Sequence, residues 1–93
     1  MMQIIWRARA KSNLAKIIRY IANEDPAAAR RIKDRLESAI LPVAEHPYLY
    51  RPGRVPGTRE LVAHPNYILV YLVAFERIEI VNVLHARQEY PLD

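Results

Sequence analysis

Hydrophobic and polar residues alternate with different spacings along the chain, and the spacings separate strand-like from helix-like segments. The run Tyr67–Phe75 has no charged residue and is rich in Val, Ile, Tyr and Phe, as is typical of a central β-strand covered on both faces or nearly so. A Pro-Asn turn signal at residues 64–66 precedes this run, and a polar pair at residues 76–77 follows it. Strands joined by such short breaks must be antiparallel. Residues 57–90 therefore predict a three-strand antiparallel unit.

Two segments before this unit have helical spacing. In residues 10–23, apolar side chains recur at positions i, i+3, i+4 and i+7, namely Leu14, Ile17, Ile18 and Ile21. A second helix is predicted from Pro26 into Ile40, because Asp25 can cap it and proline suits a first turn whose N–H groups lack partners. Pro42 predicts a kink or an early end. Two amphipathic helices with so short a break form an αα-hairpin.

The remaining segments are a short strand and a stiff loop. Gln3–Trp6 is apolar and β-prone, and we expect it to join the later sheet. Residues 45–57 contain several prolines and both glycines, which predicts an ordered loop in which Leu49 and Val55 are buried. The predicted order is β-α-α-β-β-β over one domain, residues 1–93. This is an α+β fold in which the helical hairpin packs on a small, mainly antiparallel sheet.

Composition narrows the class of protein. The chain has 93 residues and no cysteine, which excludes disulfides and thiolate metal sites. No charged leader precedes an apolar stretch, and no apolar run approaches the ~20 residues that span a bilayer, so we expect a soluble cytoplasmic protein that does not contact membranes. A formal net charge of +4 favours an acidic partner, which could be nucleic acid or protein.

Several kinds of catalytic or binding site are excluded by spacing. Both glycines lie among prolines rather than at the start of a helix, so the chain has no phosphate-binding loop. The three histidines do not form the i, i+4 pair of a zinc protease, and we expect neither a metal nor another cofactor. Both serines fall in predicted helices without the turn that exposes a nucleophile. Basic and acidic residues mix on the second helix, which is typical of a solvent-exposed face.

One set of polar residues at or near the predicted strand ends remains: Arg59, His85, Arg87 and Tyr90, with Arg51 and Arg54 in the preceding loop. Arginine recognises phosphate or carboxylate with two parallel hydrogen bonds, and histidine transfers protons near neutral pH. Tyrosine can stack on a base or donate a proton. Such a set is compatible with RNA cleavage. Each residue taken singly is more often an ordinary solvated or hydrogen-bonded strand end than a catalytic residue.

The whole chain resembles the RelE/ParE superfamily of small bacterial toxins, and is closer to its ParE, or plasmid-stabilisation, branch. The segments that carry the resemblance are residues 25–30 (DPAAAR), 46–47 (HP), 51–53 (RPG), 57–61 (GTREL), Tyr67 with 70–71 (VY), and 83–87 (VLHAR). They occur in order and with family-like spacing over almost the full length. The resemblance implies the fold predicted above.

The two branches differ in their targets. RelE-like members cut mRNA on the ribosome with basic residues, one of which is an arginine directly after the tyrosine that opens the central strand. That position is Ile68 here, and loss of the arginine would remove phosphate stabilisation worth several (~3) kcal/mol. Resemblance to the ParE branch, whose members poison DNA gyrase, therefore implies a gyrase inhibitor that binds rather than catalyses. Its candidate contact residues are Arg51, Arg54, Arg59, His85 and Arg87.

Two alternatives stay open. One is a RelE-like, ribosome-dependent mRNA endoribonuclease that uses Arg59, His85, Arg87 and Tyr90. The other is an inactive domain that is retained because it binds its antitoxin. In every case the resemblance implies a cognate antitoxin, often with a ribbon-helix-helix dimer that binds DNA and a disordered acidic tail that folds across the toxin. The net positive charge fits such a partner.

Overall fold

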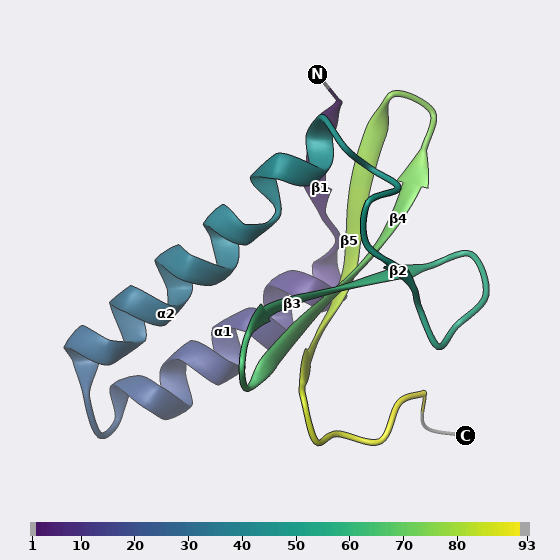
Figure 1. Cartoon of the computed structure of the whole chain (residues 1–93). Coiled ribbons are helices and arrows are strands. Elements are labelled where there is room, and N and C mark those ends of the chain that lie inside the picture. Colours follow the sequence, from purple (N-terminus) through teal and green to yellow (C-terminus); the bar gives the residue numbers. More distant parts are fainter. Residues whose placement is uncertain (1, 92–93) are drawn as a thin grey trace.

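A computed structural model describes residues 2–91, and it has two helices packed against one face of a five-stranded sheet (Figure 1). In chain order the elements are β1 (Gln3–Trp6), α1 (Ala8–Ala22), α2 (Pro26–Ala39), a 3-10 turn (Leu41–Ala44), β2 (Arg51–Pro52), β3 (Arg59–His64), β4 (Tyr67–Ala74) and β5 (Arg77–His85). The α+β architecture and the order of its main elements are confirmed. The structure adds β2, a two-residue strand inside the segment predicted to be only a loop.

The sheet has the strand order β1-β5-β4-β3-β2. β3, β4 and β5 form the predicted antiparallel unit, and β2 adds to it antiparallel. β1 instead pairs parallel to β5, with Gln3 opposite Arg77, because the helical hairpin carries the chain back across the sheet. β4 therefore lies in the middle of the sheet, as its uncharged sequence predicted.

Local chemistry accounts for the helix ends. The Asp25 carboxylate accepts a hydrogen bond from the Ala28 N–H at 3.0 Å, so this residue caps α2 as predicted. α2 ends at Ala39, and Pro42 lies in the 3-10 turn that follows, which confirms the early end expected at this proline. Within residues 2–91, neither helix is long and apolar enough to cross a membrane.

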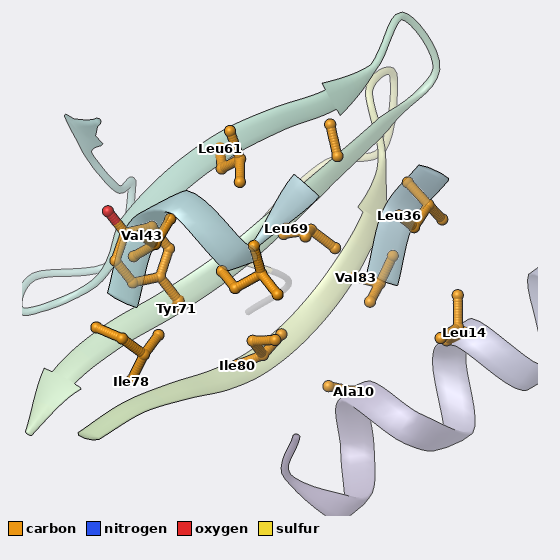
Figure 2. Packing of buried hydrophobic residues seen from close by; sticks show 12 residues of the cluster. Ala10, Leu14, Leu36, Val43, Leu61, Leu69, Tyr71, Ile78, Ile80 and Val83 are labelled. Atoms are coloured by element: carbon orange, nitrogen blue, oxygen red, sulfur yellow. The ribbon is translucent and has the colours of Figure 1, made fainter. Parts of the chain in front are cut away.

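The main core lies between the helical hairpin and the sheet face that we call the helix face. Figure 2 shows Leu14 and Leu36 from the helices facing Leu69 and Val83 from the strands. Tyr71 is fully buried in this core, and its hydroxyl donates a hydrogen bond to the Pro47 carbonyl at 2.8 Å. Burial raises the pKa of the Tyr71 hydroxyl, although the nearby Arg59 charge opposes the rise.

The opposite side of the sheet, which we call the open face, carries a smaller apolar cluster. Ile68, Val70 and Leu84 are buried there, and Val81 and Tyr90 pack against them. Beyond β5 the chain turns away from the helices (yellow in Figure 1), and this C-terminal segment, residues 86–91, brings Tyr90 onto the cluster. Within the described residues no helix packs on this face, so the C-terminal segment covers part of the apolar cluster.

The loop of residues 45–57 differs in one respect from the prediction. Leu49 is 70% exposed, so the expectation that it is buried is wrong, whereas Val55 is half-buried. Tyr50 packs against the main core in place of Leu49. The loop is therefore anchored to the core by an aromatic side chain, and the leucine beside it is exposed to solvent.

Candidate functional site

The two loop arginines of the predicted set lie beside a buried carboxylate on the open face. Glu60 of β3 is only 3% exposed, and its carboxylate accepts hydrogen bonds from the Arg54 backbone N–H at 2.8 Å and the Arg54 Nε at 3.1 Å. Arg51 lies 3.4 Å from the same carboxylate. Burial raises the pKa of Glu60, but the Arg54 hydrogen bonds and the charges of Arg54 and Arg51 outweigh it and leave the pKa below its ordinary value.

Arg54 also connects this carboxylate to the C-terminal segment. Its guanidinium lies 5.7 Å from the centre of the Tyr90 ring, a cation–π contact. Tyr90 in turn packs on the apolar cluster of the open face. Glu60, Arg54 and Tyr90 therefore hold the loop, β3 and the C-terminal segment together. Arg54 and Tyr90, two residues of the predicted set, thus already have partners within the chain.

Arg59 is likewise held inside the fold. It is the first residue of β3, and its Nη1 donates to the Tyr50 carbonyl at 2.7 Å and to the Tyr48 carbonyl at 3.3 Å. Its guanidinium lies 4.9 Å from the centre of the Tyr48 ring. Arg59 therefore fastens the loop to the sheet, which limits its freedom to reach a ligand.

His85 and Arg87 are exposed and take part in no ion pair within residues 2–91. His85 ends β5, and its Nδ1 accepts a hydrogen bond from the Arg87 backbone N–H at 3.1 Å, which fixes the turn after β5. Arg51 and Arg54 are exposed as well, but both pair with Glu60. His85 and Arg87 are therefore the exposed members of the predicted set that have no ion-pair partner in the described residues.

A groove of about 510 Å³ adjoins His85, and the sequence analysis did not identify it. Its polar and aromatic walls come from α1 and from the ends of β4 and β5, and include Lys16, Tyr20, Tyr67, His85 and Gln88. The Tyr67 ring lies edge-on to the His85 ring at 5.6 Å and tilted to the His64 ring at 5.5 Å. Burial, and secondarily the Arg35 charge, lowers the pKa of His64. The sequence points to Tyr67 and His85 separately, but it gives no signal that Tyr20 of α1, which is 77% exposed, lies beside them.

The predicted residues do not gather at one point. Arg59 pairs with Tyr71 and His85 pairs with Tyr67, so the two lie four residues apart along β4, or ~13 Å, and on different sides of that strand. Tyr90 contacts Arg54 rather than His85. Ile68 is buried under the C-terminal segment. Within residues 2–91, no three side chains that could bind a metal ion lie together.

Comparison with known proteins identifies the class to which this fold belongs. Over residues 4–90 the sequence matches the family described as the ParE toxin of the type II toxin-antitoxin system, parDE. The chain belongs to this family, within the ParE/RelE superfamily, so the resemblance noted above is confirmed. Membership implies a cognate antitoxin as its partner.

Individual relatives agree with this assignment. The chain is 42% identical to the protein Y4kP of Sinorhizobium fredii over 90 residues, which cover 96% of this chain and 93% of that protein. It is 39% identical to Toxin RelE2 of Caulobacter vibrioides over 88 residues, with 92% and 97% covered. A structure of the chromosomal ParDE system from P. aeruginosa matches with a TM-score of 0.81 and 21% identity, covering 91% of this chain and 96% of that one. This last likeness establishes the fold alone.

Proposed function

We propose that this toxin inhibits DNA gyrase by binding to it, without catalysing a reaction. The observation that supports the proposal is the position of Ile68. This residue is 4% exposed and lies beneath the C-terminal segment, at the place where a RelE-like ribonuclease carries its central arginine. A phosphate at this position would meet the apolar cluster on which Tyr90 packs, and it would find no positive side chain at residue 68. Gyrase is a cytoplasmic enzyme, so the proposal includes a cytoplasmic site of action.

The surface that we assign to the target comprises His85, Arg87 and the adjoining aromatic groove. Arg51, Arg54 and Arg59 already have partners within the chain, so their contribution would be to hold the loop in shape. Tyr20 and Tyr67 line this groove, and Tyr and Arg are residue types that are over-represented in protein-binding hot spots.

We also propose that the antitoxin is acidic and of the ribbon-helix-helix type. The net charge of +4 and the exposed basic side chains of both helices would attract an acidic disordered segment and accelerate its association. Neutralisation would follow when this segment folds over the toxin.

Supercoiling of a relaxed plasmid by purified gyrase provides the test. We expect the toxin to block supercoiling or to trap a cleaved gyrase–DNA complex, and an excess of antitoxin to prevent both effects. Gyrase that supercoils normally, with no trapped complex, at toxin levels that arrest growth would refute the proposal. Codon-positioned cuts in mRNA from the same cells would favour the ribonuclease alternative, and the absence of any growth arrest would favour an inactive antitoxin-binding domain.

A pair of variants locates the contact surface. Arg87→Ala removes an exposed guanidinium from the turn that follows His85, and we expect it to weaken gyrase inhibition by about 10-fold, or ~1.4 kcal/mol. Arg31→Ala makes the same change of charge on the exposed side of α2 and should change inhibition less than about 2-fold. Equal loss in both variants would show that general charge, and not this surface, governs the activity.

A further inference from the structure

A second cleft lies at the other end of α1, where β1 leaves the sheet. β1 pairs with β5 only as far as Ile80. Among residues 2–91, the later residues of β5, from Val81 on, therefore have no neighbouring strand on the β1 side of the sheet. The start of α1 and the C-terminal segment border this uncovered edge and enclose two adjoining hollows of about 550 and 370 Å³. Arg9, Asn82 and Tyr90 line both hollows. None of these contacts belongs to the groove beside His85.

Asn82 contributes an unused hydrogen-bond donor to this cleft. It is 7% exposed, and its Oδ1 accepts hydrogen bonds from the Asn13 side chain at 2.6 Å and from the Val83 N–H at 2.9 Å. The bond from Val83 fixes which amide atom is the oxygen, so Nδ2 is the atom left over, and it donates to no group within residues 2–91. No fully buried side-chain nitrogen or oxygen in this part of the chain lacks a partner, so Nδ2 opens toward the cleft.

The start of α1 adds further unused donors. The first intrahelical hydrogen bond runs from the Lys11 N–H to the Arg7 carbonyl, so the N–H groups of Ala8 and Arg9 precede the first turn and have no helical acceptor. No side chain caps this end, and the first turn contains no acidic residue. An uncapped helix start carries a partial positive charge and favours anions.

The charged and polar side chains around the cleft are also donors. Arg9 is exposed and takes part in no ion pair among residues 2–91, whereas the neighbouring Arg7 is paired with Glu79 at 2.7 Å. Gln88 uses its Oε1 to accept from the His85 N–H, so its amide nitrogen remains available. Among residues 2–91, no carboxylate lines either hollow. The described part of the cleft therefore offers donors from a helix end, a strand and a guanidinium.

We propose that this cleft binds a phosphate group carried by a nucleotide or by a nucleic-acid backbone. Phosphate is bound by arginine side chains and by the backbone N–H groups of helix N-termini, and donors of both kinds border this cleft. The Tyr90 ring, which borders both hollows, gives a base or sugar next to that phosphate an aromatic surface. This inference extends beyond gyrase inhibition, because Arg9, Asn82 and Tyr90 line the cleft and not the groove beside His85, although Asn13 and Gln88 border both.

Titration of the ¹⁵N-labelled full chain with inorganic phosphate, followed by NMR, tests the site directly. We expect the largest shifts at the backbone amides of Ala8 and Arg9 and at the Asn82 side-chain amide. A nucleoside monophosphate and a short single-stranded DNA oligonucleotide then distinguish the source of the phosphate. Equal affinity for both indicates a free nucleotide, and tighter binding of the oligonucleotide indicates the backbone. Shifts confined to residues outside the cleft would overturn the proposal, as would binding of an acidic peptide there without binding of phosphate.

Two variants in the cleft and one control variant distinguish phosphate binding in the cleft from a general effect of net charge. Asn82→Asp keeps the Oδ1 that Asn13 and Val83 need but replaces the free donor by a negative oxygen, so phosphate should bind about 10-fold or more weakly. Arg9→Gln should weaken binding about 5-fold. Arg31→Gln, on α2, lowers the net charge by the same unit and should change the affinity less than about 2-fold.

The outcome does not depend on one variant folding. Circular dichroism and thermal unfolding establish whether Asn82→Asp retains the fold, and if it does not, the comparison of Arg9→Gln with Arg31→Gln decides alone. Equal weakening by Arg9→Gln and Arg31→Gln would overturn the site. Gyrase is not needed in these measurements. They can therefore reject phosphate binding without affecting the proposal of gyrase inhibition, and the supercoiling test can reject gyrase inhibition without affecting phosphate binding.

Discussion

The two faces of the sheet are stabilised in different ways. The helix face packs against α1 and α2 through a large apolar core, in which Leu36, Leu69, Ile78 and Ile80 are fully buried. The open face has a cluster of three buried residues under the C-terminal segment, beside a buried carboxylate with two arginine partners. Burial of apolar surface therefore governs one face, whereas a few contacts between distant segments govern the other.

This difference shows where the fold can tolerate variation. A side chain removed from the large core leaves a cavity bounded by rigid elements, because both helices and four strands meet there. The open face is covered by a segment without helix or strand, which can move to fill a gap. We therefore expect the helix face to determine stability and the open face to adapt more easily to a partner.

Equivalent truncations on the two faces give the largest expected effect. Leu36 and Leu84 are both 0% exposed, so the change to Ala removes the same atoms from equally buried positions. Leu36→Ala should lower the free energy of unfolding by about 3 to 4 kcal/mol and Leu84→Ala by about 2, because the C-terminal segment can collapse onto the smaller cavity. Urea unfolding of both variants measures the difference. Equal losses would show that the open face is as rigid as the main core.

Arginine at Ile68 is the next largest change. Ile68→Arg places a charge at a position that is 4% exposed, and we expect a loss of about 3 kcal/mol, or displacement of the C-terminal segment. Val62 pairs directly with Ile68 in the sheet but is 56% exposed, so Val62→Arg should change stability by less than about 0.5 kcal/mol. Thermal unfolding compares the two. An Ile68→Arg protein of normal stability would mean that the tail is only loosely placed over this face.

The buried carboxylate predicts a pH dependence. Glu60→Gln removes the charge that Arg51 and Arg54 face, and it should cost about 1 to 2 kcal/mol at pH 7, since both arginines are partly solvated. Because the pKa of Glu60 is lower in the folded chain than its ordinary value near 4.5, its contribution is complete above that pH and is lost as the pH falls through the folded pKa.

Unfolding curves over this pH range provide the measurement. The difference between wild type and Glu60→Gln should shrink steadily below pH ~4.5. Glu24→Gln, at an exposed carboxylate that forms no ion pair within residues 2–91, serves as the control and should follow wild type throughout. A constant gap at all pH values would contradict a role for the Glu60 charge.

The smallest expected effect concerns the C-terminal segment itself. Tyr90→Ala removes the ring that packs on the open-face cluster and under Arg54, and should cost about 1 kcal/mol. Tyr20→Ala, at a ring that is 77% exposed, should change stability by less than about 0.5 kcal/mol. A chemical denaturation series resolves this difference. If Tyr90→Ala were neutral, the tail would not contribute to covering the open face.

Local signals in the sequence predicted most of the fold. Asp25 with Pro26 set the start of α2, Pro42 set its end, and the uncharged run after Tyr67 identified the central strand, because each depends on chemistry within a few residues. β2 was missed since two residues carry no periodicity of their own. Its strand conformation comes from pairing with Arg59 and Glu60.

The site was harder to predict because it depends on which distant residues meet. The sequence pointed to six candidate residues but did not reveal that Glu60 faces Arg51 and Arg54, or that Arg59 binds loop carbonyls. The groove beside His85 combines α1 with two strand ends, and the spacing along the chain does not specify how a helix is placed over a sheet. Whether Arg87 and His85 contact a target stays a prediction.

The parallel pairing of β1 with β5 also has a consequence for the order of folding. Gln3 lies opposite Arg77 and Trp6 opposite Ile80, so the first strand that the ribosome makes can join the sheet only after the last one has emerged. Contacts between such distant positions slow folding, and the edge of β5 stays bare until then. During synthesis, the nascent toxin therefore remains without its completed sheet until β5 has left the ribosome.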